Sequence, residues 1–181
     1  MIIFITGGAK NGKSSLAQTL TCRLAGGGRR YYVATMLPVD EEDRERIRRH
    51  IADRDGLGFE TWERPRDLTG GLPDIDRNAA FLIDSATALL MNELFPPERN
   101  YEPDPDAPRR CREDLCRFVR SVANAVVVSD YIYSDACRYD EITELYRRGL
   151  ADIDRSLAAV SDTVLEVCAG RIIVHKGELP V

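Results

Sequence analysis

A glycine-rich segment near the N-terminus has the residue types and the spacing of a phosphate-binding loop. The run Gly7-Gly8-Ala9-Lys10-Asn11-Gly12-Lys13-Ser14 matches the pattern G-x-x-x-x-G-K-[ST] in full. Glycines let backbone N–H groups close around phosphate oxygens, and a helix that follows directs its positive end at the same anion. We expect Lys13 to reach the β- and γ-phosphates of a nucleotide and Ser14 to bind Mg²⁺. The alternative is a glycine turn that matches by chance, and the order strand, motif, helix argues against it.

Two aspartates that follow apolar runs are candidates for the carboxylate beside the metal ion. Asp84 follows Phe81-Leu82-Ile83, and Asp130 follows Val126-Val127-Val128-Ser129. A carboxylate at the end of a buried strand is a typical Mg²⁺ partner in nucleotide sites of this kind. An aspartate after a strand can equally cap the next helix. We favour Asp84 as the metal ligand, and Asp130 stays open as the alternative.

A charged segment over 40–54 places a histidine between two arginines. Arg46, His50 and Arg54 are spaced four residues apart, so they share one face of the predicted helix. Guanidinium groups are good donors to phosphate oxygens, so this histidine suits nucleophilic attack on a nucleotide phosphate. Ile47 and Ile51 lie one turn apart and predict the buried edge of the helix.

Spacing alone favours a plainer interpretation of the same helix. A solvated charged helix would pair Glu42 with Arg46 and Glu45 with Arg49, and His50 would have no role. The residues by themselves therefore leave the histidine nucleophile as a hypothesis.

The hydrophobic pattern alternates between strands and helices along the whole chain. It predicts strands over 2–6, 31–35, 79–84 and 125–129, helices over 14–24, 40–54, 86–95, 110–123 and 139–160, and a terminal hairpin over 163–168 and 172–175. Strands separated by helices predict an α/β fold with a mostly parallel sheet covered on both faces, and the hairpin adds an antiparallel end. A length of 181 residues suits one domain, 1–181, in which the proline-rich segment 96–108 is an exposed loop.

Composition excludes several classes of function. A formal net charge of −5 argues against general binding of nucleic acid, which usually needs a basic face. No apolar run approaches the roughly 18 residues of a membrane helix, and no signal peptide is recognisable. Five cysteines without a C-x-x-C pair are typical of reduced thiols, so we expect a cytoplasmic protein without a zinc site.

With these pieces in place, the chain resembles the bifunctional adenosylcobinamide kinase/adenosylcobinamide-phosphate guanylyltransferases of cobalamin synthesis. The resemblance covers residues 1–95 in the order of that family, and the Arg-Ile-x-x-His segment is its most specific part. It is carried by Thr6 with the phosphate-binding loop, Tyr32-Val33-Ala34-Thr35, Arg46-Ile47-x-x-His50-x-x-x-Arg54, Thr61-x-Glu63 with Pro65, and Leu82-Ile83-Asp84-Ser85-x-Thr87 with Asn92.

The resemblance implies a RecA-like P-loop domain and a role for each matched residue. The helix histidine of the family carries the guanylyl group as a covalent intermediate, and that role falls on His50. The nucleotide would lie near Ala34, Thr35, Met36, Arg54, Glu63 and Asp84. The resemblance also implies ATP and GTP as substrates with Mg²⁺, a corrinoid acceptor, and a homo-oligomer that is a trimer in known members.

The C-terminal half departs from the pattern of the family. Where the family has Ser/Thr-Asn-Glu-Val-Gly after the fourth strand, this chain has Ser129-Asp130-Tyr131-Ile132-Tyr133. Later, the long helix has Asp154-Arg155 where the family has Asn-Gln. Two other functions therefore stay open: a diverged small-molecule kinase without guanylyl transfer, and a nucleotide-binding subunit without catalysis.

Overall fold

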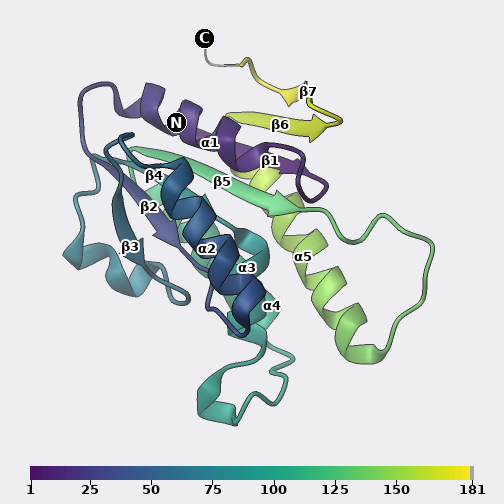
Figure 1. The fold of residues 1–181 in the computed structure, drawn as a ribbon. Coiled ribbons are helices and arrows are strands. Elements are labelled where there is room, and N and C mark those ends of the chain that lie inside the picture. Colours follow the sequence, from purple (N-terminus) through teal and green to yellow (C-terminus); the bar gives the residue numbers. More distant parts are fainter. Residues whose placement is uncertain (180–181) are drawn as a thin grey trace.

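Seven strands form one sheet in the computed structural model, which describes residues 1–179 (Figure 1). Their order across the sheet is β3-β2-β4-β5-β1-β6-β7, and every pair is parallel except β6 with β7. The strands are β1 Ile2–Gly7, β2 Arg30–Ala34, β3 Glu60–Glu63, β4 Ala80–Asp84, β5 Asn124–Asp130, β6 Thr163–Cys168 and β7 Arg171–Lys176.

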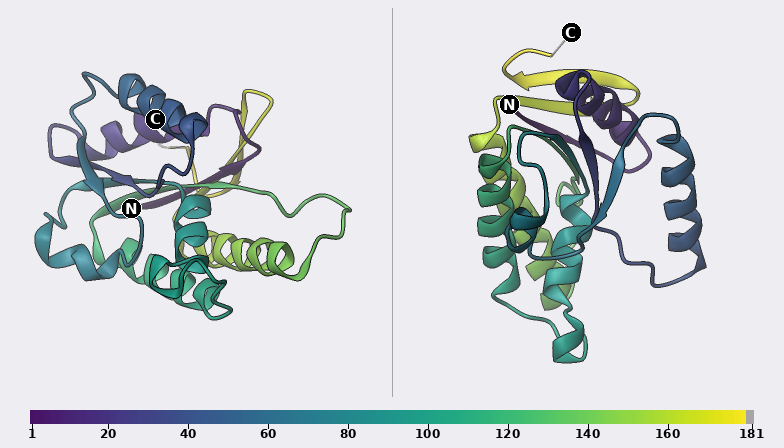
Figure 2. Two further views of the ribbon diagram at one scale, coloured as in Figure 1. Left: turned by 60° about the horizontal axis from the view of Figure 1, so that its bottom comes forward. Right: turned by 90° about the vertical axis from the view of Figure 1, so that its left-hand side faces the viewer.

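Helices cover both faces of this sheet, as Figure 2 shows. On one face α1 (Lys13–Ala25) packs on the central strands through Ala17 and Leu20. On the other face lie α3 (Ala86–Leu94), α4 (Ala107–Ser121) and α5 (Glu141–Val160), with two 3₁₀ turns at Thr69–Asp74 and Pro97–Arg99. The two central strands β4 and β5 are apolar without alternation because each contacts helices on both faces.

Helix α2 (Glu41–Asp53) differs from the others, since none of its residues is buried. It begins at Asp40, whose carboxylate accepts a hydrogen bond from the N–H of Asp43, and acidic residues fill its first turn. The predicted buried edge is wrong for Ile51, which is 51% exposed. The apolar stripe of α2 lines a pocket instead of the core, and the helix lies beyond α1 at the outside of the molecule (Figure 2).

The other expectations from the sequence agree with this architecture, with two differences. The α/β class, the mostly parallel sheet and the terminal antiparallel hairpin are confirmed. Strand β3 was not predicted, because three of its four residues are exposed at the sheet edge. The segment 96–108 is largely exposed, although Asp104 is buried and α4 already begins at Ala107. The last two residues of the expected domain 1–181 lie outside the described residues.

Candidate active site

The phosphate-binding loop joins β1 to α1 through a backbone that only certain residues allow. Gly7 has a φ of +153°, and a Cβ atom there would lie 2.4 Å from the carbonyl oxygen of Val167 on β6. Gly12 has a φ of +89° and directly precedes the first turn of α1. Both positions therefore need glycine, and the N-terminus of α1 is directed at the centre of the loop.

Within the loop the side chain of Lys13 is buried and held by two oxygens. Its Nζ atom donates to the carbonyl oxygen of Gly8 at 2.6 Å and lies 2.6 Å from Oδ1 of Asp130. The lysine is only 5% exposed. Asp130 is the counter-ion of this amine, and contact of Lys13 with nucleotide phosphates stays a prediction.

Both candidate aspartates lie at the carboxyl edge of the sheet, on neighbouring strands. Asp130 ends β5 opposite Gly7, and Asp84 ends β4 opposite Val128. Asp130 is engaged by the buried lysine, whereas Asp84 accepts one hydrogen bond, from the hydroxyl group of Tyr32 at 3.2 Å. The less engaged carboxylate is Asp84, and this difference favours it as the metal ligand.

The imidazole of His50 lies against Asp84. Its Nδ1 atom is 3.8 Å from Oδ2 of Asp84, is buried, and makes no hydrogen bond within the described residues. A ring with Nδ1 enclosed in this way has Nε2 as its remaining nitrogen for chemistry. Among the described residues, the expected pairs Glu42–Arg46 and Glu45–Arg49 do not form. The exposed face of α2 carries other ion pairs, in which Arg48 contacts Glu41 and Glu45.

A pocket of about 700 Å³ lies beside the phosphate-binding loop, between α2 and the ends of β2, β3 and β4. The guanidinium of Arg54 stacks 4.1 Å from the ring centre of Tyr32 and donates to the hydroxyl group of Thr61 at 3.1 Å. Of the residues expected around a nucleotide, those that line this pocket are Ala34, Met36, Arg54, Glu63 and Asp84, and the expected nucleophile His50 lines it too. Thr35 does not line it, because its buried hydroxyl group bonds to the backbone of Ser85.

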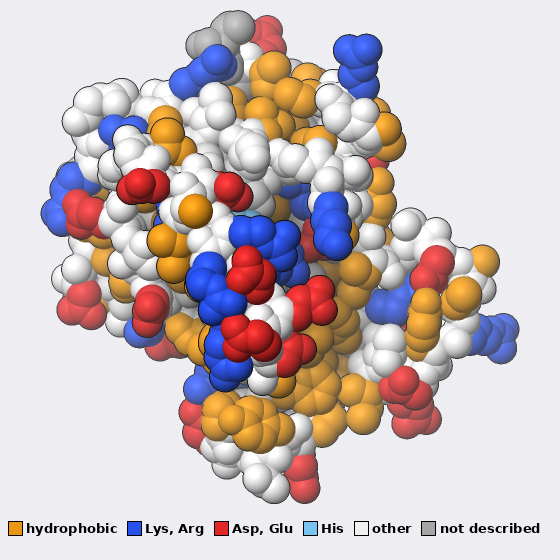
Figure 3. Space-filling model, viewed as in Figure 1, with side chains coloured by type: hydrophobic (Ala, Val, Ile, Leu, Met, Phe, Trp, Pro, Cys, Tyr) orange, Lys and Arg blue, Asp and Glu red, His pale blue; other side chains and the backbone are white. Residues whose placement is uncertain are grey.

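This pocket and the cleft over the phosphate-binding loop have lining residues in common. The cleft over the phosphate-binding loop has a volume of about 290 Å³, and Arg46, His50 and Asp84 line both this cleft and the larger pocket. Mixed acidic and basic side chains of α2 cover this region in Figure 3. A nucleotide with its phosphates in the loop and its base in the pocket would therefore extend past His50, which lies between the two.

Sequence reasoning missed Tyr32, whose hydroxyl group holds Asp84. Burial and the charge of Asp84 raise the pKa of this tyrosine, so it stays a donor. We expect Tyr32→Phe to slow any reaction that needs Asp84 and His50 by about 3- to 10-fold, the worth of one hydrogen bond, with the fold intact. Tyr31→Phe is the matched control on the same strand, because the contacts of Tyr31 are made by its ring, which stacks on Phe81 and lies against the guanidinium of Arg29. Equal rates for both variants in a guanylyl-transfer assay would contradict this role.

The divergent stretch after β5 surrounds a buried carboxyl group. Asp154 on α5 is 4% exposed, accepts a hydrogen bond from the hydroxyl group of Tyr133 at 2.8 Å, and leaves Oδ1 without a partner among the described residues. Burial raises the pKa of this carboxyl to about 6. Tyr133 and Asp154, two of the residues that replace the pattern of the family, therefore contact each other.

This carboxyl predicts a pH dependence of stability. Asp154 titrates near 3.9 when unfolded and at about 6 when folded, so the folded state binds more protons between these values. The free energy of unfolding therefore falls as the pH rises from about 4 to about 6. We expect Asp154→Asn to flatten that slope and to gain about 2–3 kcal/mol relative to wild type above pH 6. Urea unfolding across this range is the measurement, with Glu141→Gln at the exposed start of α5 as control. An unchanged slope in Asp154→Asn would rule the carboxyl out as its source.

Solved structures with the same architecture define the class of protein. An ATPase from the type III secretion system of pathogenic bacteria matches with a TM-score of 0.55 and 14% identity over 91% of this chain, which spans half the length of that ATPase. A KaiC-like protein from Pyrococcus horikoshii OT3 matches with a TM-score of 0.53 and 14% identity, over 97% of this chain and 78% of that one. The fold is therefore of the RecA-like P-loop class.

Sequence comparison then specifies the family. The family model described as cobinamide kinase / cobinamide phosphate guanyltransferase matches residues 3–174, and the chain belongs to this family. Two relatives of the chain are the bifunctional adenosylcobalamin biosynthesis proteins CobU of Escherichia coli K12 and of Salmonella typhimurium LT2. They are 24% and 26% identical to this chain, respectively. Each alignment covers 94% of this chain and 97% of the relative. Members of the family are transferases, as the resemblance implied.

Proposed function

We propose that this protein phosphorylates adenosylcobinamide and then transfers GMP from GTP to the product, through a covalent intermediate on His50. One observation carries the proposal. His50, Arg46 and Asp84 line both the cleft over the phosphate-binding loop and the adjoining pocket. A site that accepts triphosphate on one side and presents a histidine to the α-phosphate suits both reactions.

In the kinase step, the γ-phosphoryl group passes to the hydroxyl group of the aminopropanol arm of the corrinoid. The oxygen of that hydroxyl bonds to the γ-phosphorus as the bond to the β-phosphate oxygen breaks, and its proton is released. Lys13 and the backbone N–H groups of the loop stabilise the charge that spreads over the phosphate oxygens.

In the guanylyl step, Nε2 of His50 attacks the α-phosphorus of GTP and pyrophosphate leaves. The phosphate of the phosphorylated corrinoid then attacks the same phosphorus and releases the histidine. Arg46 and Arg54 on the same helix face would bind phosphate oxygens, and Asp84 would fix the orientation of the ring through Nδ1. Dividing the transfer into two steps is the usual gain of nucleophilic catalysis.

Magnesium fits the residues at this edge of the sheet. The described residues contain no cluster of three His, Cys, Asp or Glu side chains able to bind a metal ion. Mg²⁺ needs none in nucleotide sites, where one or two protein oxygens and the phosphates of the substrate suffice. Ser14 and Asp84, which both line the cleft, would hold the ion, and it would neutralise charge on the phosphates.

The proposal includes a single catalytic domain, a cytoplasmic location, no nucleic-acid partner and a homo-oligomer, for which the resemblance implies a trimer. All five cysteines are free, which supports a reducing compartment. No helix among residues 1–179 is long and apolar enough to cross a membrane. Apolar side chains on β7, namely Ile172, Ile173 and Val174, are 41–44% exposed and supply surface for association.

The decisive test is conversion of the corrinoid by the pure protein. Adenosylcobinamide is incubated with ATP, GTP and Mg²⁺, and the products are separated and weighed by mass spectrometry. We expect the phosphorylated corrinoid first and the GDP-linked corrinoid second. Phosphorylation without guanylyl transfer would establish the diverged kinase instead, and the divergent stretch after β5 is the observation that favours this second candidate. Nucleotide binding with neither product would contradict both.

A further inference from the structure

The segment 131–140, which joins β5 to α5, folds around one buried arginine (Figure 1). Arg147 on α5 is 7% exposed. Its guanidinium contacts four residues of the segment and one of α5, namely Ile132, Asp135, Cys137, Tyr139 and Glu144. The shortest of these contacts is the 2.6 Å hydrogen bond to Oδ1 of Asp135. A planar donor with this many partners holds the segment in one shape.

This segment begins at the cleft over the phosphate-binding loop. Asp130 directly precedes it and lines that cleft. The N–H of Tyr131 donates to the carbonyl oxygen of Gly7, the first residue of the loop, at 3.4 Å. Farther along, Tyr133 is bonded to Asp154 on α5. A molecule that reaches the phosphates from the side of α5 would therefore contact the segment.

The pocket expected to hold a nucleotide base lies on the other side of the sheet. Helix α2, which lines that pocket, and α5 lie on opposite sides of the sheet in both views of Figure 2. In phosphoryl transfer the attacking and leaving oxygens are roughly in line with the phosphorus, so the acceptor approaches opposite the leaving nucleotide. With the nucleotide on the side of α2, the side of α5 is left for the acceptor.

The surface on the side of α5 is apolar. The hydroxyl group of Tyr146 on α5 donates to the carbonyl oxygen of Thr87 on α3 at 3.0 Å, so the two helices meet there. One turn from that contact, Ile142 on α5 and Met91 on α3 are exposed, as is Tyr139 in the segment. Figure 3 shows hydrophobic side chains over the surface between α2 and this segment. Exposed apolar surface beside a polar cleft is typical of a ligand site.

We propose that the segment 131–140 and the start of α5 form the wall that binds the corrinoid acceptor, in the shape set by Arg147. This inference rests on the proposed function. A corrinoid is a flat macrocycle with methyl groups on its faces and amides at its rim, so it suits an apolar surface with polar groups around it. Ile132, Tyr139 and Ile142 supply the apolar surface. The aminopropanol arm would extend from this wall into the cleft, and Arg147 is a positioning residue behind it.

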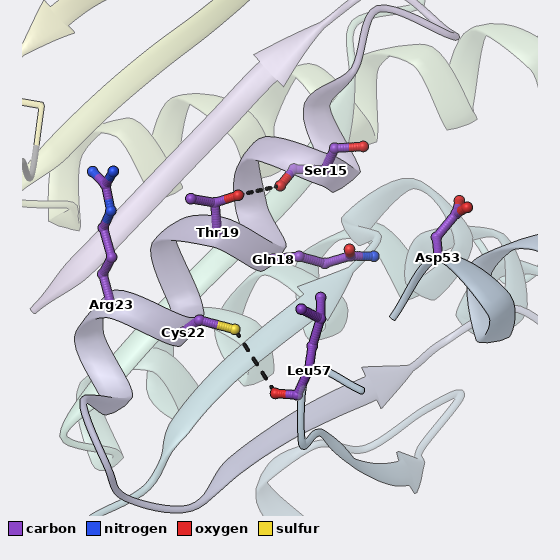
Figure 4. Close-up of a pocket in the computed structure, with 7 residues that line it drawn as sticks. All are labelled: Ser15, Gln18, Thr19, Cys22, Arg23, Asp53 and Leu57. Atoms are coloured by element: carbon purple, nitrogen blue, oxygen red, sulfur yellow. Dashed lines mark hydrogen bonds between the residues drawn. The ribbon is translucent and has the colours of Figure 1, made fainter. Parts of the chain in front are cut away.

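Equilibrium binding tests the wall without turnover. Dialysis of adenosylcobinamide, followed by its visible absorbance, gives the Kd for protein saturated with Mg²⁺ and β,γ-imido-ATP. We expect Ile142→Gln to raise this Kd about 10-fold, because apolar contact area is lost, and to change the nucleotide Kd less than about 2-fold. Leu57→Gln, at an exposed apolar residue in the groove beside α1 (Figure 4), should change neither. An unchanged corrinoid Kd in Ile142→Gln would overturn the proposal.

Substitution of Arg147 gives an independent result. Arg147→Lys keeps the charge but loses the planar fork, so we expect faster hydrogen exchange of the amides in 131–140 and a corrinoid Kd raised about 10-fold. The nucleotide Kd and the rate of His50–GMP formation should stay at the wild-type values. Arg148→Lys, at an exposed position on the same helix, is the control. Faster exchange with an unaltered corrinoid Kd would contradict the positioning role.

Two further outcomes separate this inference from its alternatives. If Ile142→Gln alters the oligomeric state in size-exclusion chromatography but not the corrinoid Kd, a second copy of the chain covers this surface and the proposal fails. If wild-type protein binds adenosylcobinamide in a manner that depends on Ile142 yet forms no phosphorylated product, the wall stands and the proposed function fails. Wild-type protein that binds no corrinoid would contradict both.

Discussion

The His50→Ala variant is expected to lose guanylyl transfer by about 10⁴-fold or more, which is the scale of removing a nucleophile that forms a covalent intermediate. Its kinase rate should fall less than about 10-fold, because the loop and Lys13 are untouched. The physical reason is the placement of the ring: Nδ1 is enclosed 3.8 Å from Asp84, and Nε2 is the nitrogen left to attack phosphorus. Release of pyrophosphate and formation of phosphorylated corrinoid, measured on the same preparation, separate the two reactions.

The second histidine of the chain supplies the matched control. His175 lies on β7, where Nε2 is 2.8 Å from Glu166 on β6. His175→Ala should retain both activities, since this residue lines neither the cleft nor the pocket. Guanylyl transfer that survives in His50→Ala would show that another group attacks GTP, and the proposed mechanism would fail there.

Replacing Lys13 by Gln is expected to reduce the kinase rate by about 10²- to 10³-fold, as for the loss of one group that stabilises transition-state charge. Guanylyl transfer should fall as well, because the same loop would hold the β- and γ-phosphates of GTP. The side chain is buried between Gly8 and Asp130, which fixes its amine inside the loop. The kinase rate is measured as the initial rate at saturating ATP, and the guanylyl-transfer rate as the initial rate at saturating GTP.

Lys10→Gln is the control for this variant, because Lys10 belongs to the same loop but lies at its exposed tip with a φ of +59°. It should change both rates less than about 10-fold, since an exposed charge contributes little to a fixed geometry. Circular dichroism of Lys13→Gln checks that the unpaired carboxylate of Asp130 does not unfold the chain. Equal losses in the two lysine variants would indicate a general charge effect and contradict a specific role for Lys13.

Much of the fold was predictable because the signals are local. A strand that stops at glycines and a helix predicted from Ser14 define the loop without any tertiary information. The alternation of strands and helices then predicts parallel pairing, which brings Asp84 and Asp130 to one edge. Strand β3 escaped prediction because it is four residues long and mostly exposed, so its pairing with β2 rather than its own pattern makes it a strand.

The site was predictable only in part, because helical periodicity does not say what a face contacts. Ile47 and Ile51 have the spacing of a core stripe, yet both line the pocket beside His50. Tyr32 in a buried strand has the pattern of a core residue, and its hydroxyl contact with Asp84 joins two residues that are 52 positions apart in the chain.

The most direct test of the central claim is the intact mass of the pure protein after incubation with Mg²⁺ and GTP. The account predicts an increase by one GMP unit, lost in acid, absent in His50→Ala, and mapped to His50 by peptide sequencing. Addition of phosphorylated adenosylcobinamide should discharge it. Protein that binds GTP but stays unmodified, or that carries GMP on a different residue, would contradict the claim that His50 is the nucleophile.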